Sequence, residues 1–145
     1  MPCRKPHRVE GDSVAPGPVL DQPVPRTGQP TTSARDATRV FLHDAARMRP
    51  PTHPESADVV LLIVAELITN AIRHTDGPCT LHLELHDDHI EIQVTDTSPQ
   101  PPQPRPPHTD GTGGWGWQLI SHLTTHTHTE PHPDGGKTIC AHTAW

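Results

Sequence analysis

Three polar residues, Glu66, Asn70 and His74, recur at every fourth position along the most apolar stretch of the sequence. On a helix, residues four apart share one face, so this spacing places a carboxylate, a carboxamide and an imidazole in one row. Buried polar groups need hydrogen-bonding partners. Two interpretations are open: the solvated stripe of an amphipathic helix, or one wall of a polar ligand site.

Asp96 places a second carboxylate at the end of an alternating apolar run. It has the parity of Ile90, Ile92 and Val94, so in a strand it points to the same side as those residues. One interpretation is that the strand has ended and Asp96 caps a turn with Ser98. The other is that Asp96 forms the floor of a pocket and accepts a hydrogen bond from a ligand.

A glycine-rich stretch, Gly111-Thr-Gly-Gly-Trp-Gly116, precedes a short apolar run. Glycines let backbone N–H groups approach phosphate oxygens, and the N-terminus of a following helix favours negative charge. Such stretches are also common in flexible loops. Gly136-Lys-Thr138 is not a P-loop, because the position five residues before Gly136 is Pro131 and a strand is expected to follow.

Apolar spacing predicts the helices that position these groups. The first starts at Ser33, where Ser33 and Asp36 resemble a capping box. Its apolar positions are Ala37, Val40, Phe41, Ala45 and Met48. A second helix runs from about Glu55 to His74 and is apolar almost all round, so we expect it to be buried.

Two alternating runs, at 80–86 and 90–95, predict an antiparallel hairpin with one apolar and one polar face. A short helix over about 117–125 follows the glycines. A second hairpin joins 127–130 to 137–143. This order predicts an α/β (α+β) fold, a two-layer sandwich in which helices cover one face of a mixed or antiparallel sheet.

The prolines divide the chain into parts. Seven of the 19 prolines lie in residues 1–32 and six lie in 99–107. The first segment has few apolar residues and is predicted to be a disordered Pro-rich tail. The domain is then 33–145, with a long loop at about 97–115, and loops of that length tend to be functional or disordered.

Charge and composition exclude several classes of protein. The net charge is −6, and an acidic chain without a basic stripe is a poor nucleic-acid binder. No apolar run approaches the roughly 20 residues that span a bilayer. The three cysteines lie far apart without CxxC spacing, which argues against a disulfide framework or a structural zinc site and favours a reducing cytoplasm. Four histidines near the end of the chain lack a diagnostic metal spacing and are expected to be solvated: His122, His126, His128 and His132.

The three polar features occur in the order found in a known family. The sequence resembles the GHKL-type ATP-binding domain shared by histidine kinases, type II topoisomerases, chaperones of the heat-shock-90 class and bacterial anti-sigma-factor serine kinases. The segment from Glu66 to His74 resembles its N box, and Asp96-Thr-Ser98-Pro99 its first glycine box in the form of the anti-sigma branch. Gly114-Trp-Gly116 resembles the second glycine box, and Gly136-Lys-Thr138 the motif on its last strand.

The resemblance implies a Bergerat-type ATP-binding fold and a role for each matching residue. Glu66 is the implied general base, and Asn70 the implied ligand of Mg²⁺. Asp96 accepts a hydrogen bond from the adenine amino group, and Thr138 lies near the adenine. The other implied ATP-binding residues are His74, Ser98, Gly114 and Gly116, with the lid at about 97–115.

The implied function is that of a single-domain anti-sigma-factor serine/threonine kinase. Such a protein binds ATP and Mg²⁺, binds a sigma factor and phosphorylates an antagonist protein. Trp115 and Trp117 depart from the second glycine box, where a basic and an aliphatic residue are usual. A nucleotide-binding module that sequesters a partner, with weak or no kinase activity, is therefore the alternative. The resemblance leaves open whether the chain forms a homodimer.

Overall fold

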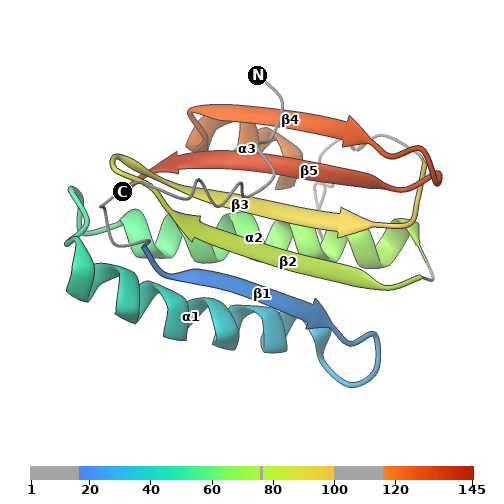
Figure 1. Cartoon of the computed structure of the whole chain (residues 1–145), viewed down its shortest axis with the longest axis horizontal. Coiled ribbons are helices and arrows are strands. Elements are labelled where there is room, and N and C mark those ends of the chain that lie inside the picture. The colour runs from blue at the N-terminus through green and yellow to red at the C-terminus, as the bar shows by residue number, and fades with distance from the viewer. Residues whose placement is uncertain (1–16, 76, 100–115) are drawn as a thin grey trace, which may run out of the picture.

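The computed structural model describes residues 17–75, 77–99 and 116–145 of the 145-residue chain. It contains five strands and three helices within these residues (Figure 1). In chain order they are β1 (Val19–Val24), α1 (Pro30–Met48), α2 (Ser56–His74), β2 (Cys79–Leu85), β3 (His89–Asp96), α3 (Gly116–Leu123), β4 (His126–Pro131) and β5 (Lys137–Ala144).

The five strands form one sheet in the order β1-β2-β3-β5-β4, and every neighbouring pair is antiparallel. In Figure 1, α2 lies behind the sheet and α1 runs below β1; α1 packs against α2, β1 and β2, so the two helices cover one face of the sheet. We call the opposite face the open face. The expected two-layer sandwich is confirmed, and so are both predicted hairpins, β2–β3 and β4–β5.

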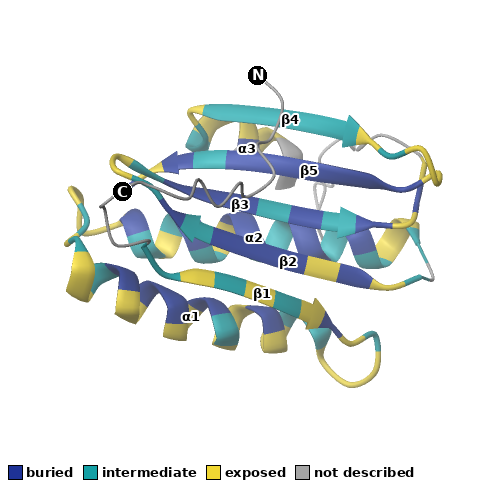
Figure 2. Ribbon diagram, viewed as in Figure 1, coloured by how far each residue is buried: buried dark blue, intermediate teal, exposed yellow. Residues whose placement is uncertain are grey.

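The core lies between α2 and the sheet. Alternate residues of the three central strands point toward the helices, and their side chains are buried (Figure 2). They include Leu81, Leu83, Ile90, Ile92, Val94 and Ile139, while α2 contributes Val60, Ile63, Val64, Leu67 and Ile68. Burial of each large aliphatic side chain contributes about 1.5–3 kcal/mol, so this layer holds α2 firmly on the sheet.

The first helix begins earlier than its sequence predicts. It starts at Pro30, whose fixed φ suits the first helical turn, and Gln29 precedes it without a side-chain cap. The expected capping box at Ser33 is therefore wrong. Val40 and Met48 are 66% and 52% exposed. The buried positions of α1 are instead Ala34, Thr38, Phe41, Leu42 and Ala45.

The segment before this helix is also part of the fold. β1 pairs with β2 along its whole length, from Val19 opposite Glu84 to Val24 opposite Cys79. In the loop that follows, Arg26 donates hydrogen bonds to carbonyl groups of Ile72, Thr75 and Gly77 at the end of α2. Residues 17–32 are thus structured, which corrects the expectation of a disordered tail over 1–32.

The described cysteines differ in state. Cys140 is disulfide-bonded, contrary to the expectation from the spacing of the cysteines, whereas Cys79 is free and buried. Among the helices in the described part of the chain, none has both the length and the apolar character needed to cross a membrane.

Trp145 closes one end of the core. Its side chain is 4% exposed, and its indole Nε1 donates a 2.8 Å hydrogen bond to the carbonyl of Arg49. The same Arg49 donates to the carbonyl of His86, in the turn between β2 and β3. Trp145 and Arg49 therefore join the α1–α2 connection to that turn.

Candidate functional site

The polar row of α2 lies on the flank of the helix. Leu67, Ile68 and Ala71 face the core, which leaves Glu66 and Asn70 half-buried and His74 exposed. Within the described residues, the side chains of this row make no hydrogen bond or ion pair with the protein. A half-buried carboxylate and carboxamide without protein partners are available to a ligand.

Asp96 forms a buried ion pair at the end of β3. The ammonium of Lys137 lies 3.0 Å from Oδ1 of Asp96, and the two side chains are 3% and 1% exposed respectively. Lys137 also donates to the carbonyl of Ser98 at 3.3 Å. The strand register explains this pairing, because Asp96 and Lys137 occupy directly opposite positions on β3 and β5.

The two oxygens of Asp96 have different surroundings. Oδ1 accepts from Lys137 and also from the backbone N–H of Ser98, at 2.9 Å. Oδ2 is buried and has no hydrogen-bond partner among the described residues. The turn-capping interpretation of Asp96 is confirmed for Oδ1. Oδ2 remains an acceptor that a ligand can satisfy, and unsatisfied buried acceptors are rare and costly in folded proteins.

Gly136 allows the β4–β5 turn to approach this carboxylate closely. A Cβ atom at Gly136 would lie 2.5 Å from the carbonyl oxygen of Asp96, so a larger residue cannot fit without a shift of the backbone. Within the turn, Asp134 accepts from the N–H of Gly136 at 3.1 Å, and Gly135 adopts φ +97°. The Pro-Asp-Gly-Gly turn thereby fixes where β5 begins and where Lys137 is placed.

Thr138 lies on the other side of the sheet from the Asp96 side chain. Its hydroxyl is 2.8 Å from Oγ1 of Thr95 and 2.8 Å from Nε2 of His132, both on the open face. There it lines a cavity of about 480 Å³ together with Glu130. Thr138 therefore does not share the face of the Asp96 side chain, because adjacent residues of a strand point to opposite faces, and its expected place near the adenine stays a prediction.

Lys137 is the site residue that sequence reasoning missed. The signal was its parity: Lys137 alternates with Ile139 and Ala141, both of which face the helices. Counting back from Ile139 places Lys137 on the same side as Asp96.

The remaining sequence-predicted residues divide between two regions. Ser98 is 6% exposed and contributes its N–H to Asp96 and its carbonyl to Lys137. Gly116 is the first residue of α3, which packs against α2. Gly114 and positions 100–115 of the expected lid lie outside the described residues.

The base of this region is also tied to the end of α2. Thr75, which follows α2, and Thr97, which follows β3, share a 2.6 Å hydrogen bond between their hydroxyls. Gly77 packs so closely on Thr97 that a Cβ atom there would lie 2.1 Å from its hydroxyl oxygen. These contacts fix Thr97, the residue that follows Asp96, beside the end of α2.

Burial and negative charge act on Cys79 at the start of β2. Burial raises the pKa of the Cys79 thiol to about 11, and the Asp96 carboxylate shifts it in the same direction. Arg26 opposes this with a smaller effect. The thiol is thus protonated and unreactive near neutral pH, and it acts as a small packing residue.

The sequence matches the family described as Histidine kinase-like ATPase domain over residues 29–142, which is most of the chain. The chain belongs to this family. The resemblance drawn from the N box, the first glycine box and the glycine-rich loop is thereby confirmed at the level of the family. Because the chain belongs to this family, it is an ATP-binding domain. No curated protein matches the sequence.

Proposed function

We propose that Asp96 recognises the adenine base of ATP. The observation that carries this proposal is that Oδ2 of Asp96 is buried and has no partner in the part of the chain that the structure describes. An adenine amino group carries N–H donors and supplies the hydrogen bond that this oxygen lacks. A base with a carbonyl oxygen at the same position presents a second acceptor and is rejected.

Lys137 supports this role through Oδ1. Its ammonium lies 3.0 Å from that oxygen and orients the carboxylate, while the N–H of Ser98 donates to the same oxygen. Ser98 and Lys137 are therefore positioning residues for the base.

The unpartnered side chains of α2 suit the phosphate end of the nucleotide. Asn70 offers an amide oxygen, and Glu66, one turn earlier, a carboxylate; hard oxygen donors are what Mg²⁺ prefers. Asn70 would hold the ion, which neutralises charge on the phosphates when bound. His74, Gly114 and Gly116 complete the proposed nucleotide contacts.

The proposed activity is transfer of the γ-phosphoryl group to a serine or threonine of a protein. Glu66 accepts the hydroxyl proton as the oxygen attacks phosphorus, the bond to the bridging oxygen breaks, and ADP leaves. The resemblance to the anti-sigma branch supports this reaction, with a sigma factor and an antagonist protein as partners and the cytoplasm as compartment. A nucleotide-responsive binding module without transfer is the second candidate, favoured by Trp115 and Trp117.

The test is calorimetric titration of the full chain with ATP and with inosine triphosphate, which carries a carbonyl oxygen in place of the adenine amino group. We expect saturable, Mg²⁺-dependent ATP binding, and inosine triphosphate to bind at least tenfold more weakly. Asp96→Asn should remove most of that difference, because a hydrogen bond to a charged group contributes about 1.5–3 kcal/mol. Equal affinity of the wild-type chain for the two nucleotides would contradict the role of Asp96.

A further inference from the structure

Two glutamates face each other on the open face of the sheet. Glu84 on β2 is directly opposite Glu91 on β3. Like charges at such positions repel each other and destabilise a sheet. The side chain of Glu91 is only 5% exposed, so its charge is also poorly solvated. A cation between the two carboxylates would offset this repulsion.

His86 lies between them. Its Nε2 is 2.8 Å from Oε2 of Glu91 and 3.9 Å from Oε2 of Glu84. The three ligand atoms of Glu84, His86 and Glu91 all lie within 4.8 Å of one another.

We propose that Glu84, His86 and Glu91 form a binding site for a divalent transition-metal ion, and that this ion is zinc. Zinc binds histidine nitrogen and carboxylate oxygen at about 2.0–2.2 Å, which places neighbouring ligand atoms of a tetrahedral ion about 3.3–3.6 Å apart. The separations of 2.8 and 3.9 Å bracket that range. The imidazole ligand disfavours magnesium and calcium, which prefer oxygen ligands throughout.

A second layer of contacts orients the two carboxylates. His82 places Nε2 3.4 Å from Oε2 of Glu84, and its Nδ1 lies 2.6 Å from Oδ1 of Asp21 on β1. Gln93 donates a 2.5 Å hydrogen bond to Oε1 of Glu91, which leaves Oε2 directed at His86. Partners of this kind fix metal ligands and strengthen binding in known sites.

The position of His86 is fixed as well. Its ring stacks on that of His89 at 4.6 Å, and its backbone N–H donates to the carbonyl of His89 at 2.9 Å. Arg49 donates to the carbonyl of His86 from the other side. The imidazole therefore needs little reordering to bind an ion, which lowers the entropic cost of binding.

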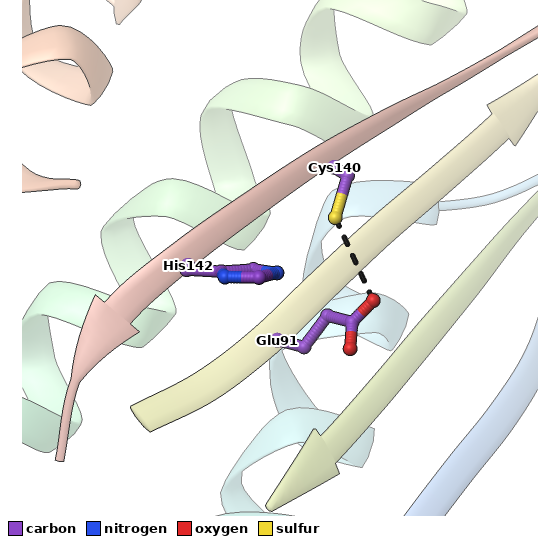
Figure 3. A group of neighbouring side chains, drawn as sticks. All are labelled: Glu91, Cys140 and His142. Carbon is purple, nitrogen blue, oxygen red and sulfur yellow. Dashed lines mark hydrogen bonds between the residues drawn. The ribbon is translucent and has the colours of Figure 1, made fainter. Parts of the chain in front are cut away.

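A neighbouring group shares Glu91 but is a weaker candidate. Figure 3 shows Glu91 with Cys140 and His142, and the sulfur of Cys140 lies 3.6 Å from Oε1 of Glu91. Because Cys140 is disulfide-bonded, its sulfur is not a thiolate ligand. Glu84, His86 and Glu91 offer three ligand atoms without the reduction of a disulfide.

The proposed metal site is separate from the ATP site. Glu84 and Glu91 point to the open face, whereas Asp96 and Lys137 point to the face covered by α2. Zinc binding can therefore be measured without nucleotide and does not depend on the proposed kinase activity.

The experiment is calorimetric titration of the metal-free, full 145-residue chain with zinc sulfate in excess magnesium. We expect one binding step of submicromolar affinity, accompanied by a higher melting temperature. Glu84→Gln and His86→Ala should each weaken that step at least tenfold. Glu84→Gln serves as the main variant, because Glu84 is 25% exposed and its replacement is compatible with folding.

Matched controls separate the site from general binding to a histidine-rich surface. His43→Ala on α1 and Glu130→Gln on β4 change the same residue types elsewhere and should leave the step unchanged. His142→Ala tests the neighbouring group. Absence of the step, its persistence in both Glu84→Gln and His86→Ala, or its loss in His142→Ala alone would each overturn the proposal.

Discussion

Lys137 donates to one oxygen of the Asp96 carboxylate, and the other oxygen has no partner within residues 17–75, 77–99 and 116–145. The two residues lie opposite each other on β3 and β5, 41 positions apart in the sequence, and both are almost fully buried. The ion pair thus stabilises the fold through Oδ1, while Oδ2 is the proposed acceptor for the adenine. Stability and nucleotide affinity should respond differently to changes in each partner.

Lys137→Met should destabilise the fold by about 3 kcal/mol, because removal of one member of a buried ion pair leaves the other charge uncompensated. Urea unfolding followed by circular dichroism measures this loss. The double variant Lys137→Met/Asp96→Asn removes the orphaned charge and should recover much of the stability. A single Lys137→Met variant as stable as wild type would show that the pair contributes little.

Glu66→Ala should abolish phosphoryl transfer and leave ATP affinity within about twofold, because a general base acts in the transition state rather than in binding. Transfer to a serine-bearing substrate and calorimetric ATP affinity are measured on the same preparation. Asp58→Ala, at an exposed position of the same helix, is the control. Unchanged transfer in Glu66→Ala would assign the base elsewhere.

Asn70→Ala should reduce the dependence of ATP binding on Mg²⁺, because the amide oxygen is the proposed protein ligand of the ion. The ratio of ATP affinities with and without Mg²⁺ is the readout, so a general loss of affinity does not mimic the effect. Thr69→Ala changes the adjacent residue of α2 and should preserve the ratio. An unchanged ratio in Asn70→Ala would place the metal ligand elsewhere.

The Cys79 thiol should make stability fall at alkaline pH. Its pKa is about 11 in the fold and 9.0 ordinarily, so the folded state holds the proton more tightly than the unfolded state. The stabilisation is complete below about pH 9 and is lost as the pH rises from 9 to 11. Urea midpoints of wild type and Cys79→Ala, compared across this window, isolate the effect, and the absence of tyrosine removes phenol titration. Parallel pH profiles of the two proteins would contradict it.

Trp145→Ala should lower the free energy of unfolding by about 3–5 kcal/mol, because it empties a buried site between the α1–α2 connection and the β2–β3 turn. Trp145→Phe keeps most of the packing and loses the hydrogen bond to Arg49, so its cost should be nearer 1 kcal/mol. Chemical denaturation of both variants measures the difference. Equal losses would make the hydrogen bond, rather than the packing, the main contribution.

Local sequence patterns predict the elements whose apolar spacing is visible within a single segment. The alternation of Leu81, Leu83 and Leu85 with polar residues predicts β2, and the apolar run of the second helix predicts α2. β1 was missed because Pro23 and Asp21 break its apolar pattern. Its strand conformation depends on pairing with β2, some sixty residues later in the chain, which no local window contains.

The candidate site also contains residues that the sequence identifies and a contact that it does not predict. Asp96 and the row on α2 were identified from spacing and resemblance. The contact of Asp96 with Lys137 depends on the register between β3 and β5, which pairs residues 41 positions apart and cannot be read from a local window. Thr138, one position after Lys137, points to the opposite face from Asp96, because one position reverses the face of a strand.

Both edge strands of the sheet contain a proline: Pro23 in β1 and Pro131 in β4. Proline has no backbone N–H, and edge strands that carry it resist pairing with further strands. The described sheet is thereby protected against growth at either border. A second copy of the chain, or an extended peptide, is then expected to dock through side chains on a face of the sheet. The two prolines also discourage fibril-like growth by edge-to-edge addition of strands.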